Sequence, residues 1–229
     1  MWSLVKSIMN KRLKNYSDRL REQQGLGPAR DLLEEVWASR QLTLVAVSPQ
    51  ICGSRRDWPE HYQVCGFMNG QGGTQEAVVP QELQVFITQG ESPIYMTFGS
   101  VMSGGDPTES VALLAEAAQK ASVRAIIQAT GWREFGFVSS AAVHYVDSAP
   151  HAEIFPHCKA IVHHGGAGTS QAALLAGKPS IVVAHTSEQE FWGRELAKIG
   201  VASKPLSRKT LRADLLAANI PVSYTHLRA

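Results

Sequence analysis

The amino-acid sequence predicts an α/β protein built on a doubly wound parallel sheet, and three observations support this fold class. Short runs of β-branched residues alternate with helical segments from residue 93 onward, which favours parallel strands joined by crossover helices. Several of the strand-like runs end in glycine next to a histidine or a small polar residue. Hydrophobic residues make up 44% of the chain and charged residues 18%, which is typical of a globular protein with a buried core.

The alternating region contains five expected strands and three expected helices. The strands cover residues 94–98, 123–128, 143–146, 160–163 and 180–183, and the helices cover residues 107–121, 169–176 and 188–199. Before this region we expect helices over residues 3–22 and 28–38 and a strand over residues 42–48. The segment from residue 49 to residue 92 lacks clear periodicity and is rich in Gly, Pro, Gln and Asn, which is typical of a linker between domains.

Composition excludes some classes of function. A net charge of +2 without a basic stripe argues against a nucleic-acid-binding protein. Three widely spaced cysteines fit a reducing compartment. Because no apolar run is long enough to cross a membrane, and the first residues lack the apolar core of a secretory signal, we expect a cytoplasmic location. The basic N-terminal helix either packs as an ordinary surface helix or makes weak contact with an anionic membrane surface.

The sharpest motif is the run Ile161-Val-His-His-Gly-Gly-Ala-Gly-Thr169, which precedes an expected helix. Its glycines allow a strand to turn tightly into a helix while the backbone approaches a ligand. The positive end of that helix suits a diphosphate, and His164 can reach the same oxygens. The alternative is a glycine-rich turn that serves backbone geometry alone. Its spacing matches neither a dinucleotide fingerprint nor a P-loop lysine motif.

The two adjacent histidines of this motif do not predict a metal site. Neighbouring residues on a strand point to opposite faces, so His163 and His164 cannot easily share one ion. We therefore expect no bound metal and interpret His163 as a packed histidine.

A second motif lies at the next strand-to-helix junction. Glu188 and Gln189 follow the expected strand 180–183, and two polar side chains at that point could bind sugar hydroxyls. The alternative is structural, because Ser187 and Glu190 have the spacing of a capping box. Residue spacing alone leaves both interpretations open.

Taken together, these residues resemble a known family. His164-Gly-Gly-Ala-Gly-Thr169, followed about twenty residues later by Glu188-Gln189, resembles the donor-binding signature of UDP-glycosyltransferases with the two-domain GT-B fold. The similarity is greatest to the branch that acts on sterols or macrolides. Phe98-Gly99-Ser100 and Thr130-Gly131-Trp132 match that branch in order and spacing, and the resemblance covers roughly residues 40–218.

The resemblance implies a role for each matched residue. The residues implied to bind the donor diphosphate are Ser100, His164, Gly166, Gly168 and Thr169. The residues implied to lie at the uracil and ribose are Trp132 and Ala149, and those implied to bind the transferred sugar are Glu188 and Gln189. The family usually has aspartate at position 188, so the glutamate here extends the reach of the carboxylate by one methylene.

The resemblance also implies a domain organisation. Residues 1–70 correspond to the end of an N-terminal acceptor domain, 71–92 to the linker and 93–220 to the nucleotide-sugar-binding domain. Residues 221–229 form a tail that departs from the family. The implied reaction is an inverting, metal-independent and cofactor-free transfer from a UDP-sugar, in particular UDP-glucose, to a lipophilic hydroxyl acceptor such as a sterol or macrolide. In this family the histidine that acts as the catalytic base lies near the start of the N-terminal domain, and no histidine of this sequence matches it. We therefore expect this chain alone to bind the donor without transferring its sugar.

Three other functions remain as alternatives. The first is a non-catalytic module that binds a nucleotide sugar or regulates a catalytic partner. The second is a sugar-nucleotide epimerase, which would need further acidic and histidine residues in the cleft. The third, a dehydrogenase, is disfavoured because no Gly-x-Gly-x-x-Gly follows the first strand of the alternating region.

Overall fold

The computed structural model describes residues 2–68, 79–99 and 106–225 of the chain. Ser100, which the sequence predicts to contact a diphosphate, lies outside these ranges. The chain divides into two compact units, Met1–Asn69 and Gly70–Ala229, and each is described by itself.

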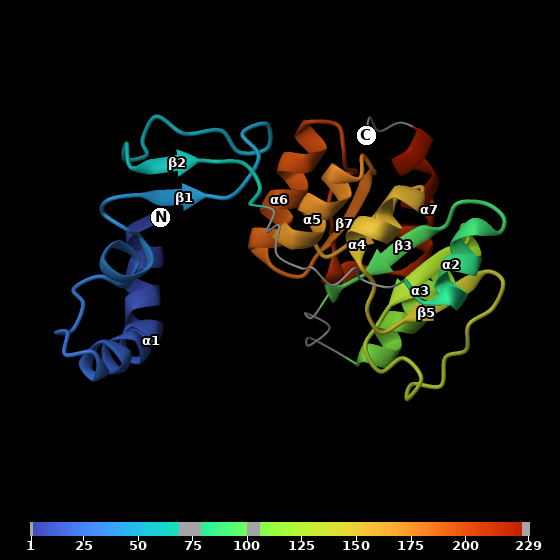
Figure 1. The fold of residues 1–229 in the computed structure, drawn as a ribbon, viewed down its shortest axis with the longest axis horizontal. Helices are drawn as coiled ribbons and strands as arrows, with labels where there is room; N and C mark the ends of the chain where they lie inside the picture. Colours follow the sequence, from blue (N-terminus) through green and yellow to red (C-terminus); the bar gives the residue numbers. More distant parts are fainter. Residues whose placement is uncertain (1, 69–78, 100–105, 226–229) are drawn as a thin grey trace. The chain divides into compact units, whose positions relative to one another are not determined.

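The first unit combines helices with a small sheet (Figure 1). Its elements are α1 (Trp2–Gln23), the π-helical turn η1 (Leu33–Trp37), β1 (Thr43–Val45) and β2 (Tyr62–Val64). The strands β1 and β2 pair in parallel, with Thr43 opposite Tyr62. The sequence predicts β1, whereas β2 falls within the segment interpreted as aperiodic.

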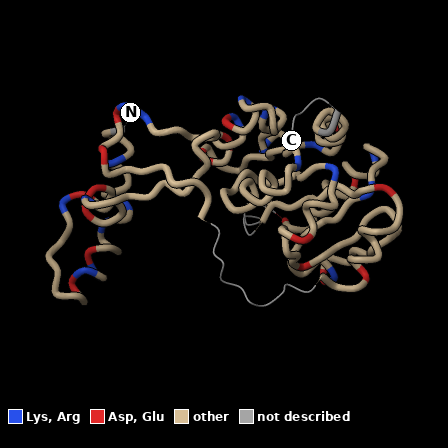
Figure 2. Tube along the Cα trace, turned by 45° about the horizontal axis from the view of Figure 1, so that its top comes forward, with Lys and Arg blue, Asp and Glu red and all other residues tan. Residues whose placement is uncertain are grey.

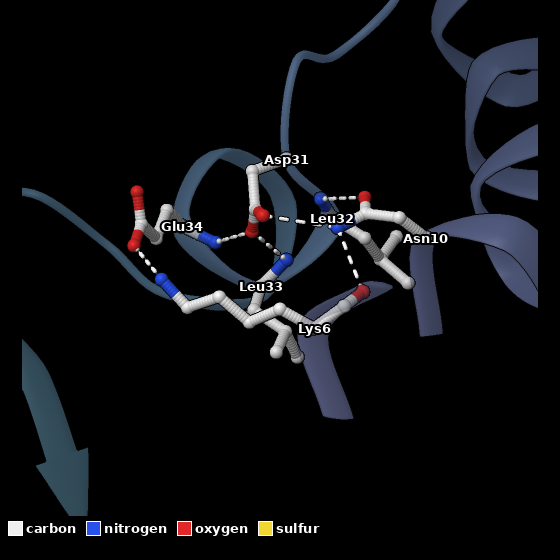
Figure 3. A network of polar contacts seen from close by, with 6 residues as sticks. All are labelled: Lys6, Asn10, Asp31, Leu32, Leu33 and Glu34. Atoms are coloured by element: carbon white, nitrogen blue, oxygen red, sulfur yellow. Dashed lines mark hydrogen bonds and ion pairs between the residues drawn. The ribbon is translucent and has the colours of Figure 1, made fainter. Parts of the chain in front are cut away.

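Side chains of α1 determine where η1 begins (Figure 3). The Asn10 Oδ1 accepts a hydrogen bond from the amide of Leu32 at 2.8 Å, and Asn10 Nδ2 donates to Asp31 at 2.9 Å. Asp31 in turn accepts from the amide of Glu34 at 3.0 Å, and Glu34 pairs with Lys6 of α1. The helix predicted over residues 28–38 is therefore shorter, because the backbone donors before residue 33 bond to side chains instead of helical carbonyls.

The second unit is built on a six-stranded parallel sheet. Its strands are β3 (Ile94–Thr97), β4 (Ala125–Gln128), β5 (Val143–Val146), β6 (Ile161–His163), β7 (Ser180–Ala184) and β8 (Leu206–Ser207). The strand order is β5-β4-β3-β6-β7-β8, and every pairing is parallel. Along the chain, β4 and β5 are therefore added on one side of β3, and β6, β7 and β8 are then added on its other side.

Helices cover both faces of this sheet (Figure 1). The helices are α2 (Gln81–Thr88), α3 (Pro107–Lys120), α4 (His151–Ile154), α5 (Ala167–Leu175), α6 (Ser187–Lys198) and α7 (Ala213–Thr225), with 3-10 turns η3 (Phe155–His157) and η4 (Arg208–Thr210). Apolar residues of α3 and α7 form one core with Ile94 and Met96 of β3. Residues of α2, α4 and α5 form the other core with Tyr95, which lies between those two on the strand. The doubly wound parallel fold predicted from sequence is confirmed.

Two segments differ from the sequence-based domain boundaries. The range 71–92, predicted to be a linker, contains α2, which buries Leu83, Phe86 and Ile87 in the core of the second unit. These residues have helical spacing, but the helix is too short for that spacing to stand out. The range 221–229, predicted to be an atypical tail, begins inside α7, which continues through Pro221 to Thr225.

The surface of the described chain carries mixed charge. Lys and Arg residues are interspersed with Asp and Glu along both units (Figure 2). In the described part of the chain, no helix combines the length and the apolar character that a membrane span needs.

Candidate functional site

The strand order locates the switch point, where the crevice of a doubly wound sheet usually binds ligands. The order in which strands are added to the sheet reverses between β3 and β6, which are neighbours in the sheet. Gly99 follows β3, and His164 follows β6. Two of the sequence-predicted regions therefore meet at the topological switch point.

The imidazole of His164 lies against two glycines. A β-carbon on Gly99 would lie 2.7 Å from Cε1 of His164, and a β-carbon on Gly166 would lie 2.3 Å from Nε2. Gly99 also has a φ of +63°, which disfavours other residues. The ring therefore occupies space that any side chain at these two positions would take, and this explains why both loops carry glycine there.

His164 presents an unpaired nitrogen at this crevice. Its Nδ1 is buried and has no hydrogen-bond partner among the described residues. Burial lowers the pKa of His164, and the nearby carboxylate of Glu188 opposes that shift. The side chain is thus a neutral imidazole at pH 7, and its buried Nδ1 lacks a partner among the described residues.

The turn after His164 leads into an uncapped helix N-terminus. Gly166 is the N-cap residue of α5, so the N-cap position offers no side-chain acceptor to the first amides of the helix. Apart from its chain neighbours and the nearby backbone of α5 itself, no atom of the described residues lies within 4 Å of the position that a β-carbon on Gly168 would take. The structure thus brings His164, Gly166, Gly168 and Thr169 together around amides that can bind an anion.

Polar side chains cap the N-terminus of α6. The N-cap is Thr186, whose hydroxyl accepts a hydrogen bond from the amide of Gln189 at 3.3 Å. Gln189 is buried, and its Oε1 accepts from the amide of His185 at 2.8 Å. The structural alternative, a capping box from Ser187 to Glu190, is wrong by one residue, because the N-cap is Thr186 and α6 begins earlier than expected. Gln189 holds the third helical position, and its side chain bonds the amide of the residue before the N-cap.

Glu188 remains on the surface of the same helix. Its Oε1 accepts a hydrogen bond from Nε1 of Trp192 at 2.6 Å. Its carboxylate acts on the pKa of His164, which places it near the crevice. Of the two residues predicted to bind sugar, Glu188 therefore faces solvent next to His164, whereas Gln189 is already engaged in capping.

Trp132 and Ala149 follow neighbouring strands. Trp132 comes after β4 and Ala149 after β5, so both lie at the edge of the sheet that also carries His164. The Trp132 ring is only 7% exposed, is stacked on Tyr145 at a centroid distance of 5.4 Å, and has the Arg133 guanidinium 4.2 Å from its centroid. A base that stacks on this ring would have to replace the guanidinium.

Two charged or titratable groups near the crevice were missed by sequence reasoning. His185 follows β7, its ring lies 5.1 Å from that of Phe98, and its buried Nε2 has no partner in the described ranges. Arg208 lies 5.8 Å from the Phe98 ring and donates to the Ser110 hydroxyl at 2.9 Å. The position of His185 at a strand end could have identified it, whereas Arg208 lies in a segment without a strand-like pattern.

Two further hollows of the second unit differ in position. One, of about 280 Å³, lies at the carboxyl ends of β7 and β8 and is lined in part by His185, Ser187 and Lys209. The other, of about 750 Å³, lies at the amino ends of β3 to β5, where Arg124 donates to the Phe86 carbonyl at 2.6 Å. Only the first lies at the same edge of the sheet as His164. Within residues 2–68, 79–99 and 106–225, no cluster of three or more His, Cys, Asp or Glu is placed to hold a metal.

Comparison with known proteins identifies the family of this domain. Residues 113–223 match the family described as "Erythromycin biosynthesis protein CIII-like, C-terminal domain". A sterol 3-beta-glucosyltransferase of Arabidopsis thaliana is 35% identical over 69% of this chain and 25% of its own length. The chain spans between 25% and 52% of the lengths of the first three curated relatives that it matches.

Solved structures show the same fold. The glycosyltransferase of kitacinnamycin superposes with a TM-score of 0.70 at 18% identity, over 91% of this chain and 52% of its own. The glycosyltransferase VinC, solved in complex with dTDP, superposes with a TM-score of 0.63 at 20% identity, over 93% of this chain and 50% of its own. The chain therefore belongs to the family of glycosyltransferase C-terminal domains, which is matched over residues 113–223.

Proposed function

We propose that the second unit binds the diphosphate of a nucleotide-sugar donor at the turn formed by residues 164–169. The observation that carries this proposal is the position of His164, whose ring lies against Gly166, the N-cap residue at the start of α5. A neutral imidazole, free amides and a helix dipole together favour an anion with several oxygens. The open space beside Gly168 leaves room for that anion to approach the backbone.

The other predicted residues extend this site along the same edge of the sheet. We place the uracil and ribose beside Trp132 and Ala149, and the transferred sugar beside Glu188 and Gln189. The side-chain nitrogen of Gln189 is the atom left for a ligand, because the side-chain oxygen accepts a hydrogen bond from the backbone. Ser100 is included on the sequence resemblance alone.

The proposed chemistry is an inverting transfer without metal or cofactor. Negative charge grows on the diphosphate as the bond to the sugar breaks, so donors fixed around it stabilise the transition state more than the ground state. An acceptor hydroxyl attacks the anomeric carbon and loses its proton to a base. We place that base outside this chain, so the chain alone binds donor without turnover.

UDP-glucose is the proposed donor, and a sterol or macrolide-like hydroxyl compound is the proposed acceptor. The similarity to a sterol glucosyltransferase supports a glucosyl donor, whereas the similarity to a glycosyltransferase solved with dTDP makes dTDP-glucose the competing choice. The second candidate function is a binding module without chemistry. The coverage of at most about half of each of the first relatives favours it for the chain in isolation.

Calorimetric titration tests the proposal. UDP, UDP-glucose and dTDP-glucose are titrated into the wild type, His164→Ala and His157→Ala, the last a control at an exposed histidine of the same unit. We expect His164→Ala to weaken UDP binding about tenfold or more, as loss of a hydrogen bond to a charged group does, and His157→Ala to have no effect. Equal UDP affinities in the wild type and His164→Ala would overturn the site. Turnover of UDP-glucose onto a sterol by the wild type would overturn the claim that the base lies elsewhere.

A further inference from the structure

His163 is the completely buried neighbour of His164. Its exposed fraction is 0%, and it lies at the end of β6 opposite Thr97 of β3 and Val182 of β7. Its Nδ1 accepts a hydrogen bond from the amide of Gly165 at 3.1 Å. A neutral imidazole that accepts at Nδ1 carries its proton on Nε2, and this Nε2 has no partner among the described residues.

The amide that His163 holds belongs to the peptide between His164 and Gly165. The orientation of this peptide plane sets the ψ of His164 and the φ of Gly165, which is +87°. The space around Gly165 is tightly filled, since a β-carbon there would lie 2.8 Å from Val182 and 3.0 Å from the Gln189 carbonyl. The turn is thus fixed by packing on one side and by the His163 hydrogen bond at its amide.

We propose that His163 is a positioning residue, which through the Gly165 amide orients His164 and the first turn of α5 toward one diphosphate. This inference rests on the function proposed above. Burial lowers the pKa of His163 to about 3, so its Nδ1 remains an acceptor across the physiological range. A histidine that served packing alone would not need its ring nitrogen, and a buried, unpaired Nε2–H is a cost that an apolar side chain of similar size would avoid.

Two substitutions separate positioning from packing. His163→Leu keeps a similar volume but removes the acceptor, and it exchanges one unpaired donor, Nε2–H, for another, the Gly165 amide. His163→Asn loses part of the ring but keeps an acceptor at the same distance along the side chain, and asparagine commonly bonds the amide two residues ahead. We therefore expect His163→Leu to lower diphosphate affinity but not stability, and His163→Asn to lower stability but not diphosphate affinity.

The experiment measures melting temperature and the affinities for UDP and uridine in the wild type and both variants. For His163→Leu we expect a melting temperature close to wild type, UDP binding weakened about tenfold and uridine binding unchanged. For His163→Asn we expect a lower melting temperature and UDP binding close to wild type. Exchange of the Gly165 amide with solvent should be fast in His163→Leu and slow in the other two proteins.

The outcomes distinguish this inference from the function on which it rests. UDP affinity equal to wild type in His163→Leu, or lost equally in both variants, would overturn the role of His163 while leaving the site in place. Equal losses of UDP and uridine affinity would also overturn it, because they would indicate a general disturbance. Failure of the wild type to bind UDP would instead overturn the proposed function.

Discussion

Nε2 of His164 lies 2.3 Å from the point where a β-carbon on Gly166 would be placed. That separation is far below van der Waals contact, so the ring position and the glycine depend on each other. Gly168, two residues further along, has no such contact. These two glycines of one turn therefore have different physical reasons to be glycine.

Gly166→Ala is expected to displace the imidazole of His164. The new methyl group cannot share space with Nε2, so the ring must rotate out of the crevice. We expect UDP binding to weaken about tenfold, similar to His164→Ala, because both changes remove the same hydrogen bond. Calorimetry of the double variant checks this, since two changes that act on one contact should not add. Additive losses would contradict the explanation.

Gly168→Ala is expected to raise stability and lower affinity. Alanine replaces glycine within α5 and meets no neighbour, so the free energy of unfolding should rise by up to about 1 kcal/mol. The same methyl would project into the space that the proposed diphosphate needs. Chemical denaturation and UDP titration of one preparation measure both effects. A variant that is more stable and binds UDP as well as wild type would place the anion elsewhere.

The sheet of the second unit could be predicted from sequence because its strands are short, buried runs. Ile94 to Thr97 and Ser180 to Ala184 are buried at every residue, as parallel strands between two helical layers must be. The helix α2 could not be predicted with the same ease. Its eight residues carry only three buried side chains, and it follows a glycine-rich segment, so local composition outweighed its short helical pattern.

The candidate site was partly readable from sequence for similar reasons. The carboxyl ends of parallel strands lie at one edge of the sheet, so the alternation predicted that the glycine-rich strand ends share that edge, whereas the pairing of β3 with β6 came from the structure. The surroundings of individual side chains could not be inferred. The cover of Arg133 over Trp132, and the capping bond of Gln189 to the His185 amide, both depend on rotamers and on helix starts that shift by one residue.

Glu188→Gln is expected to tighten UDP binding and to lower the preference for UDP-glucose over UDP. Glutamine can still accept the hydrogen bond from Trp192, so α6 should be unaffected. Removing the negative charge near His164 relieves repulsion of a diphosphate, which we expect to tighten UDP binding by about twofold. The sugar would lose a carboxylate partner, so the preference for UDP-glucose over UDP should fall.

A matched control for that change lies on the same helix. Glu190→Gln removes an equal charge that pairs with Arg194 at 2.5 Å on the exposed face of α6. We expect calorimetry to show that this variant binds UDP and UDP-glucose with the same affinities as the wild type. A parallel effect of both substitutions would mean that net charge, rather than contact with the sugar, explains the result.

Arg133→Ala is expected to tighten uridine binding. The guanidinium covers the Trp132 ring, and its ion pair with Asp147 at 3.2 Å is exposed, so its loss should cost less than about 1 kcal/mol of stability. A uracil that stacks on Trp132 would no longer have to displace it, and we expect a gain of about threefold in affinity, within the range of one cation–π contact. Arg133→Lys, which keeps the cation, is the control. Weaker uridine binding in Arg133→Ala would instead make Arg133 a ligand of the nucleoside.

Stability is expected to fall as pH decreases from 7 to 5.5. Burial lowers the pKa of five histidines in the second unit, namely His144, His151, His163, His164 and His185. The unfolded chain binds protons at these histidines near pH 6.5, and the folded chain does not. The stability that the five neutral side chains contribute is therefore fully present above pH 6.5, and it is lost as the pH falls below that value.

His163 provides the means to check this pH dependence. Its pKa of about 3 in the folded state implies a contribution whose slope is about 0.7 kcal/mol per pH unit at pH 6.5 and approaches about 1.4 kcal/mol per pH unit near pH 5.5. Urea denaturation at pH 7.0, 6.0 and 5.5 should therefore show a shallower decline for His163→Leu than for the wild type, with a difference that grows toward one proton at the lowest pH. Carboxylates do not account for the difference, because they titrate at lower pH. A free energy of unfolding that stays constant between pH 7.0 and 5.5 in the wild type would contradict the buried, neutral state of these side chains.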